Sequence, residues 1–181
     1  MKKKDFIFLT SGSIIVIVLV LAIYFFVGGP MFVNGDSMNP YLEDKDVVMV
    51  NRLAYVGRNP ERFDLIVFPY KYDKNNKYVK RVIGLPGETI EIINNEIFIE
   101  KDGIKNKLIE YYGIYEGISI NSRKDFGPVT LGENEYFVLG DNRYHSSDSR
   151  QDDVGAVNKT EIIGKVVFRF LPFKNIGSLV D

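Results

Sequence analysis

Three short segments of the chain place hydroxyl, amine and carboxylate side chains beside glycines and prolines. They are residues 34–40 (NGDSMNP), 80–88 (KRVIGLPGE) and 140–150 (GDNRYHSSDSR). Each segment alone is also typical of an ordinary turn, because Gly, Pro, Asn, Asp and Ser are the residues that turns prefer. Rigid scaffolds, however, commonly present functional groups on loops at strand ends. The chemistry these segments offer is hydrolysis by hydroxyl, amine and carboxylate groups.

The chain contains no cysteine and a single histidine, His145. A catalytic thiol, a disulfide framework and a thiolate metal site are therefore excluded. A site with several imidazole ligands, such as a three-histidine zinc site, is excluded as well. A serine hydroxyl is a poor nucleophile near neutral pH and needs a base. That base must then be either His145 or a lysine.

In their order along the chain, the three segments resemble the type I signal peptidases, the membrane-anchored serine proteases that remove signal peptides from exported proteins. The matching motifs are Gly-Asp-Ser-Met-x-Pro, Lys-Arg-Val-Ile-Gly-Leu-Pro-Gly-Glu, Gly-Asp-Asn-Arg-x-x-Ser-x-Asp-Ser-Arg, the run 62–68 (RFDLIVF) and the closing residues 155 and 163–165. The small size of the chain and its single apolar N-terminal segment, residues 6–27, resemble the short Gram-positive form of this family. The resemblance implies that Ser37 is the nucleophile and Lys80 the general base.

A lysine can accept the proton of a serine only when the amine is neutral. Because the ordinary pKa of lysine is about 10.4, the folded site must lower the pKa of Lys80. Burial away from water has that effect, since it disfavours the charged form. Tyr78, Val79 and Val82 surround Lys80 in the sequence. An apolar strand is therefore predicted to carry Lys80 into the interior.

The resemblance also implies groups that support the pair. The hydroxyl of Ser146 is expected to orient Lys80. An ionic support is expected from Asp148 with Arg81 and Arg150, holding the third segment against the second.

For the substrate, the resemblance implies an extended peptide with small side chains, typically alanine, at the first and third positions before the cut. Val33, Leu42 and Val79 are expected to line the pockets for those side chains. The backbone N–H of Ser37 is expected to meet the oxyanion. Some family members carry a serine two residues before the nucleophile as a second oxyanion donor. This chain has Gly35 there, as other short members do, so the second donor stays open.

The sequence offers two alternatives to the serine–lysine site. His145 could form a Ser–His–Asp arrangement with Ser37, although the histidine lies beside positions that vary in the family. The acidic stretch 141–153 could bind calcium, but an alternating ligand loop would need oxygen ligands at 143 and 145, which are Arg and His. No metal and no cofactor are therefore expected.

Residues 6–27 contain no charge and no proline. A helix of this length is about 33 Å long at a rise of about 1.5 Å per residue, which matches a hydrocarbon core of about 30 Å. A cleavable signal has a shorter apolar core, so a transmembrane helix is predicted. Because the lysines stand before this span, residues 1–5 are expected in the cytoplasm and 28–181 outside. Met31, Phe32, Val33 and Met38 are expected to dip into the lipid interface.

The formal net charge is −1. Three of the 23 basic and one of the 24 acidic residues precede residue 36, so the remainder of the chain is mildly acidic. A nucleic-acid-binding surface is not expected, because such surfaces carry an excess of Lys and Arg. The expected partners are signal peptides of preproteins and the lipid bilayer, and the protein is expected to be monomeric.

After residue 36, short runs rich in Val, Ile, Phe and Tyr recur between turn signals, as in strands. They are 47–50, 65–68, 78–83, 89–93, 96–100, 136–139 and 161–170. Asn94 and Asn95 tolerate the left-handed backbone of a two-residue turn, so a hairpin is predicted there. Residues 101–135 are expected to form an extended hairpin or loop insertion. The predicted fold is mostly β, an antiparallel catalytic domain of the signal-peptidase type with one N-terminal transmembrane helix.

The function that the resemblance implies is a membrane-anchored serine endopeptidase in the cell membrane, cutting after small-x-small sites through an acyl-enzyme. The first alternative is a non-catalytic relative that acts as a scaffold or pilus-assembly factor. A self-cleaving repressor shares the chemistry but would carry a DNA-binding domain in place of the span. A mitochondrial inner-membrane processing peptidase is the third alternative.

Overall fold

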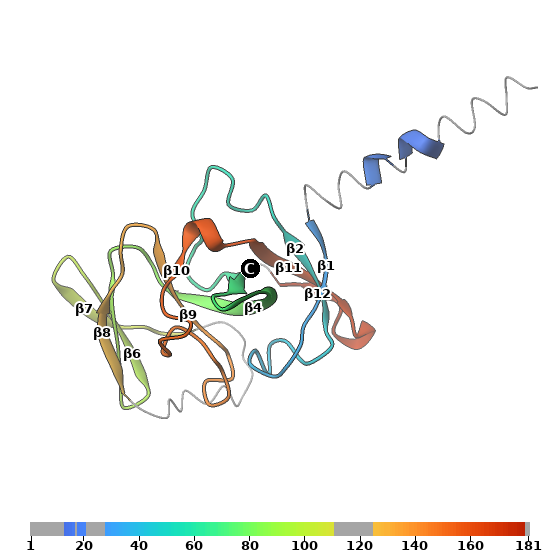
Figure 1. Cartoon of the computed structure of the whole chain (residues 1–181). Coiled ribbons are helices and arrows are strands. Elements are labelled where there is room, and N and C mark those ends of the chain that lie inside the picture. Colours follow the sequence, from blue (N-terminus) through green and yellow to red (C-terminus); the bar gives the residue numbers. More distant parts are fainter. Residues whose placement is uncertain (1–12, 17, 21–27, 111–124, 180–181) are drawn as a thin grey trace, which may run out of the picture.

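The computed structural model describes residues 13–16, 18–20, 28–110 and 125–179 of the chain. These residues form two antiparallel sheets (Figure 1). The larger sheet has the order β1-β2-β11-β3-β4-β9-β10, with β12 paired to β11, and the smaller has the order β7-β6-β5-β8. The predicted fold class, mostly β and antiparallel, is confirmed for the described residues.

The larger sheet supplies the elements on which the site is built. Its strands are β1 (Gly28–Phe32), β2 (Val47–Asn51), β3 (Leu65–Tyr70), β4 (Asp73–Gly84), β9 (Glu135–Leu139), β10 (Val157–Asn158), β11 (Gly164–Leu171) and β12 (Gly177–Ser178). Two short 3-10 helices accompany it, η2 (Lys159–Glu161) and η3 (Phe173–Asn175). The smaller sheet consists of β5 (Thr89–Ile93), β6 (Glu96–Lys101), β7 (Ile104–Lys107) and β8 (Phe126–Thr130).

Each of the seven predicted runs overlaps a strand of the structure. In the run 161–170 the strand β11 begins only at Gly164, because the preceding residues form η2, which Asn158 caps and Glu161 completes as a capping box. The predicted hairpin is confirmed: β5 pairs with β6 across Asn94 and Asn95, whose φ values are +50° and +67°. The sequence pattern did not predict β1, β7, β8, β10 or β12, which are short or carry glycine, proline or mostly polar residues.

The predicted insertion 101–135 contributes two strands to the smaller sheet. β7 pairs with β6, and β8 pairs with β5 on the other side. Residues 111–124 lie outside the described chain. The insertion therefore widens a hairpin into a separate four-stranded sheet.

Most of the predicted transmembrane helix, 6–27, and all of the predicted cytoplasmic segment, 1–5, lie outside the described residues. The described parts of that helix, 13–16 and 18–20, are helical, and their side chains are exposed. Among the described residues, no helix is both long and apolar enough to cross a membrane.

Apolar side chains from both sheets are packed in three buried clusters. One cluster lies below the catalytic candidates and includes Val33, Met38, Leu42 and Val79. A second joins the two sheets and includes Ile90 of β5 and Leu139 of β9. At the end of β4, a Cβ on Gly84 would lie 2.7 Å from Ile90, so glycine permits this close contact between the sheets.

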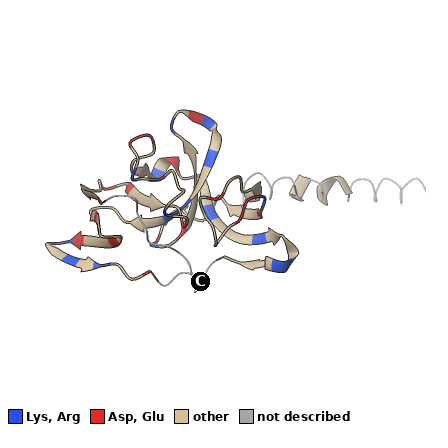
Figure 2. Ribbon diagram, turned by 90° about the horizontal axis from the view of Figure 1, so that it is seen from below, with Lys and Arg blue, Asp and Glu red and all other residues tan. Residues whose placement is uncertain are grey.

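The charged side chains are mixed over the surface. In Figure 2, both Lys or Arg and Asp or Glu occur on strands and loops across the domain. This distribution agrees with the weak net charge of the sequence.

Candidate active site

β4 carries Lys80 into the interior next to Ser37. The Nζ of Lys80 donates a hydrogen bond to Ser37 Oγ at 2.7 Å and another to the carbonyl of Val79 at 3.1 Å. Only 3% of Lys80 is exposed, as predicted from its apolar neighbours in the sequence. Ser37 lies on the loop between β1 and β2, so the contact joins residues 43 positions apart in the chain.

The environment of Lys80 favours a neutral amine. Burial lowers the pKa of Lys80 to about 8, against the opposing effect of the negative charges on Asp148 and Asp141. The Nζ also lies 5.2 Å from the ring centre of Tyr78, and an aromatic face attracts the charged form. Desolvation outweighs these attractions. A buried amine with this pKa, in contact with a hydroxyl, can accept the hydroxyl proton when it is neutral.

The pair opens into a cleft of about 590 Å³. Among the residues that line the cleft are Ser37, Lys80, Val33, Val79 and His145. Leu42, in contrast, is fully buried in the core and is not among the described lining residues. The expectation that Leu42 lines a substrate pocket therefore does not match the structure; the side chain packs beneath the cleft wall.

The loop between β9 and β10 holds the nucleophile loop in place. The backbone N–H of Asn142 donates to the carbonyl of Ser37 at 3.0 Å, and its side-chain Nδ2 donates to the carbonyl of Asp36 at 3.1 Å. A Cβ on Gly140 would lie 2.4 Å from the same Ser37 carbonyl oxygen. Sequence reasoning included these residues in a motif but gave neither of them a role.

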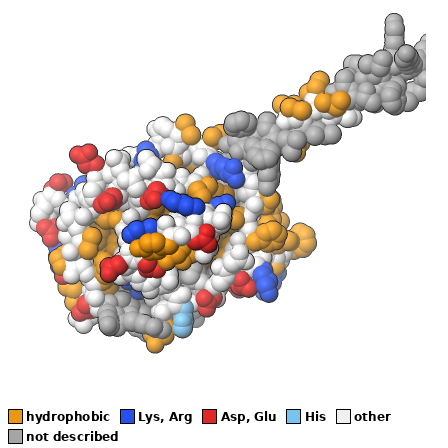
Figure 3. All heavy atoms as spheres, viewed as in Figure 1, with side chains coloured by type: hydrophobic (Ala, Val, Ile, Leu, Met, Phe, Trp, Pro, Cys, Tyr) orange, Lys and Arg blue, Asp and Glu red, His pale blue; other side chains and the backbone are white. Residues whose placement is uncertain are grey.

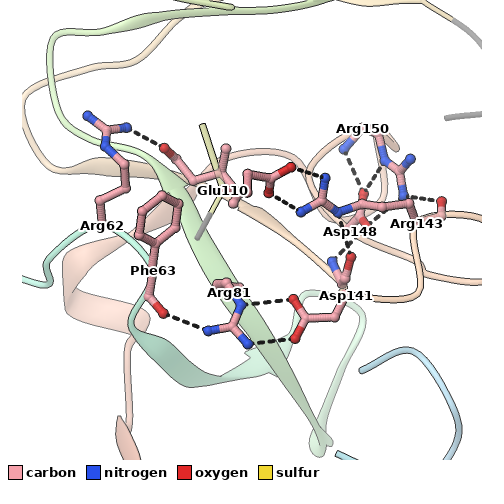
Figure 4. Close-up of polar contacts among 10 residues, drawn as sticks. Arg62, Phe63, Arg81, Glu110, Asp141, Arg143, Asp148 and Arg150 are labelled. Carbon is pink, nitrogen blue, oxygen red and sulfur yellow. Dashed lines mark hydrogen bonds and ion pairs between the residues drawn. The ribbon is translucent and has the colours of Figure 1, made fainter. Parts of the chain in front are cut away.

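Buried ion pairs stabilise this loop (Figure 4). Arg81 binds Asp141 with two hydrogen bonds, of 2.8 and 2.6 Å, and donates a third to the carbonyl of Phe63. Arg150 binds both carboxylate oxygens of Asp148. The expected pairing of Asp148 with Arg150 is present. For Arg81, the carboxylate that accepts its two side-chain hydrogen bonds is Asp141 rather than the expected Asp148.

A third ion pair reaches the loop from the insertion. Arg143 forms a bidentate pair with Glu110, and its Nε donates to the carbonyl of Gly140 at 3.0 Å. The exposed fractions of the two side chains are 2% and 11%. Sequence reasoning missed this pair, since Glu110 lies in the least patterned part of the chain.

Ser146 lies close to the loop that carries Ser37, but the expected hydrogen bond between Ser146 and Lys80 is not present. Its Oγ would be 2.1 Å from a Cβ on Gly140, which itself would lie 2.4 Å from the Ser37 carbonyl. The Ser146 Oγ is buried and has no hydrogen-bond partner within the described chain. In this structure the hydrogen bonds of Lys80 Nζ go to Ser37 and Val79 instead.

Two backbone N–H groups near the Ser37 hydroxyl, those of Ser37 and Gly35, differ in their hydrogen bonding. The N–H of Ser37 makes no hydrogen bond to any described residue. The N–H of Gly35 is already bonded to Asp44 Oδ1 at 2.8 Å. Gly35 also has a φ of +89°, a left-handed conformation that favours glycine over serine.

Comparisons with known proteins agree with this reading of the sequence. The family model described as "Signal peptidase, peptidase S26" matches residues 7–171. Signal peptidase I P of Bacillus subtilis subsp. natto is 39% identical over 97% of this chain and 94% of its own length. Signal peptidase I S of Bacillus subtilis strain 168 is 36% identical over the same shares.

A solved structure of a signal peptidase I from Enterococcus faecalis V583 is 32% identical and covers 60% of this chain and 97% of that chain, with a TM-score of 0.47. The family match and the β architecture define the protein as a β-rich hydrolase of the peptidase class. More particularly, the chain belongs to the signal peptidase family, peptidase S26, and is a type I signal peptidase.

Proposed function

We propose that the protein cleaves signal peptides from exported preproteins with Ser37 as nucleophile and Lys80 as general base. The observation that carries the proposal is the 2.7 Å contact between Ser37 Oγ and the Nζ of Lys80, whose pKa burial lowers to about 8. A lysine in this state supplies the base that a serine hydroxyl needs near neutral pH.

The reaction begins when neutral Lys80 takes the proton of Ser37 and the Oγ attacks the scissile carbonyl. The resulting oxyanion meets the free backbone N–H of Ser37. Collapse breaks the peptide bond, and the leaving amine takes the proton from Lys80. The mature protein departs, leaving the signal peptide as an ester on Ser37. Water, deprotonated by Lys80, then hydrolyses the ester and restores the enzyme.

Five residues act through the pair rather than on the substrate. Arg81 and Arg150 fix the β9–β10 loop through Asp141 and Asp148, so that the loop backbone can hold the nucleophile. Ser146 is buried next to this loop and keeps an unpaired hydroxyl in the described chain.

The substrate adds as an extended strand between two open strand edges. β4 pairs with β9 only from Arg81 onward, and β1 pairs with β2 alone, so both leave an edge without a described strand partner. Residues of both strands line the cleft. Because alternate side chains of an added strand face the enzyme, the first and third positions before the cut are read together. The buried walls at Val33 and Val79 favour small side chains there.

The N-terminal segment 6–27 anchors the enzyme in the cell membrane, with residues 1–5 in the cytoplasm and 28–181 outside. Confinement to the bilayer raises the effective concentration of membrane-embedded signal peptides. The enzyme acts as a monomer, without metal or cofactor.

Exposed apolar side chains at one end of the larger sheet support contact with lipid. Phe32 and Leu171 both pair with Val47 and so share this end, with η3 directly after Leu171. Phe32 is 68%, Phe173 78% and Ile176 52% exposed. Figure 3 shows apolar side chains gathered at the right-hand end of the domain, where Figure 1 places β1 and β12.

Of the four residues first expected in the lipid interface, Val33 and Met38 are buried, at 5% and 1% exposure, and Met31 is partly buried. Only Phe32 is free to insert. The variant Phe173→Ser with Ile176→Ser should therefore slow cleavage of a preprotein embedded in vesicles but not of a detergent-dissolved peptide. Val56→Ser, at an equally exposed site, is the control. If the double variant and the Val56→Ser control cleaved the vesicle-embedded preprotein at equal rates, the proposed contact with lipid would be contradicted.

The dyad is tested by incubating the full-length protein with a preprotein that carries an Ala-x-Ala site. Ser37→Ala and Lys80→Ala should each abolish cleavage. His145→Ala should keep most of the rate, since the hydrogen bond to Ser37 comes from Lys80. Full cleavage by either dyad variant, or a loss in His145→Ala as severe as that in Lys80→Ala, would refute the assignment. The non-catalytic alternative, a scaffold or pilus-assembly factor, is not favoured.

A further inference from the structure

The peptide unit between Asp36 and Ser37 carries a carbonyl held by hydrogen bonds and an N–H that makes no hydrogen bond to any described residue. The cis peptide bonds among the described residues all precede proline, so this unit is trans. In a planar trans unit the C=O and the N–H point in opposite directions. Hydrogen bonds that fix the direction of the Asp36 carbonyl therefore also fix the direction of the Ser37 N–H.

Two donors hold the Asp36 carbonyl. The side-chain Nδ2 of Asn142 lies 3.1 Å from it, and the backbone N–H of Asn39 lies 3.0 Å from it. Asn39 belongs to the same turn as the peptide unit, whereas Asn142 comes from the loop after β9. Asn142 is thus the donor that connects this peptide unit to another part of the chain, the loop after β9.

Asn142 is itself held rigidly. Its backbone N–H donates to the Ser37 carbonyl, so one residue binds the carbonyls on both sides of the nucleophile. Its Oδ1 accepts the N–H of His145 at 3.3 Å, which leaves Nδ2 turned toward Asp36. The preceding residue, Asp141, is fixed by its bidentate pair with Arg81.

We propose that Asn142 is a positioning residue that aims the Ser37 N–H at the oxyanion of the tetrahedral intermediate. The inference rests on the proposed nucleophile, Ser37. A hydrogen bond to a peptide carbonyl also polarises the peptide and strengthens its N–H as a donor. The amide of Asn142 therefore supports the transition state without touching the substrate.

The test compares Asn142→Ala and Asn142→Asp with the wild-type full-length enzyme. Asp keeps the shape and an oxygen for the His145 N–H but lacks the donor, so a loss shared by both variants reports the donor. Direct removal of an oxyanion donor costs about 100-fold to 1,000-fold in kcat. Because Asn39 still holds the carbonyl, we expect kcat to fall about tenfold, with KM changed less than about twofold.

A second readout separates orientation from folding. A peptide aldehyde ending in Ala-x-Ala forms an oxyanion when Ser37 adds to it, whereas the free signal-peptide product does not. Both Asn142 variants should bind the aldehyde about tenfold more weakly and the product unchanged. Asn106→Ala, on exposed β7, is the matched control.

Three outcomes would overturn the inference. They are unchanged kcat in Asn142→Ala, a rise in KM at constant kcat, and equal weakening of aldehyde and product. If Ser37→Ala kept full activity in the same assay, the proposed nucleophile would fail instead, so the two failures are distinguishable. A lowered thermal midpoint detects a variant that fails to fold. If Asn142→Ala fails to fold, the affinities of folded Asn142→Asp for the aldehyde and for the product test the inference in its place.

Discussion

The pKa of Lys80 is set by opposing effects. Desolvation disfavours its charge, while Asp148, Asp141 and the ring of Tyr78 favour it. The net effect places the pKa of Lys80 at about 8, far enough below the ordinary value to leave a useful fraction of neutral amine near neutral pH. The pKa of Lys80 is thus lowered by burial and not by a partner charge.

This balance predicts the pH dependence of cleavage. The free enzyme should show an acidic limb in kcat/KM with an apparent pKa of about 8, because only neutral Lys80 accepts the Ser37 proton. Below that value the rate should fall about tenfold per pH unit. Initial rates on a short Ala-x-Ala peptide across the pH range measure the limb. A limb at the pKa of an ordinary histidine, about 6.5, would point to His145 instead.

Burying Lys80 should also cost folding stability. Its folded-state pKa, about 8, lies below the ordinary 10.5, so the unfolded chain binds the proton more tightly. The cost is complete below about pH 8 and disappears as the pH rises through 10.5. Lys80→Met should therefore inactivate the enzyme and raise its free energy of unfolding by about 3 kcal/mol at about pH 6.

Denaturant unfolding of wild type and Lys80→Met at two pH values checks this prediction. The gain should shrink toward zero at about pH 11, where both states hold a neutral amine. A gain that does not depend on pH would show that packing, and not the charge of Lys80, is responsible.

At the scale of elements, the sequence was most informative where neighbouring residues alone determine the local structure. The apolar neighbours of Lys80 predicted its burial, and the Asn94–Asn95 pair predicted the hairpin because both residues tolerate positive φ. β1 was not predicted, since a strand that begins Gly-Gly-Pro is favoured only at a sheet edge.

The side-chain partners in the β9–β10 loop could not be read from the sequence in the same way. Asp141 and Asp148 both stand near Arg150 in the chain, and only the path of the loop decides which carboxylate meets Arg81. The same path leaves Ser146 without the expected contact and brings Asn142 onto the nucleophile loop. Long-range partner choice depends on tertiary geometry, which residue patterns do not encode locally.

The close approach of the two loops predicts a severe effect of Gly140→Ala. The added Cβ would lie 2.1 Å from Ser146 Oγ and 2.4 Å from the Ser37 carbonyl, and the latter is backbone that cannot rotate away. Displacement of the nucleophile should lower kcat at least about 100-fold. Overpacking should also cost about 1–3 kcal/mol of stability.

Gly177→Ala is the matched control for Gly140→Ala. At Gly177 an added Cβ meets no atom within 4 Å, so rate and thermal midpoint should stay unchanged. Wild-type activity in Gly140→Ala would contradict the close packing of the two loops.

At the scale of the whole molecule, the larger sheet brings three distant parts of the chain to one cleft. The loop after β1 supplies Ser37, β4 supplies Lys80, and the loop after β9 donates hydrogen bonds to the carbonyls of Asp36 and Ser37. The smaller sheet is joined through the end of β4 and contributes Glu110, near its edge strand β7, to the loop's ion pairs.

The assembled site predicts that cleavage is independent of metal. In the part of the chain that the structure describes, no three His, Asp or Glu side chains gather to hold an ion. Extensive treatment with EDTA should leave the initial rate unchanged. Loss of activity in the chelator, restored by a defined divalent cation, would contradict this prediction.

The central claim is that burial lowers the pKa of Lys80 beside Ser37, so that a useful fraction of the amine is neutral near neutral pH. It is tested most directly by titrating that amine. Nitrogen-15 NMR of the lysine-labelled full-length protein should show one amine, missing in Lys80→Ala, with a midpoint of about 8. A Lys80 midpoint near the ordinary value of about 10.4 would contradict the account, because almost none of the amine would then be neutral near neutral pH.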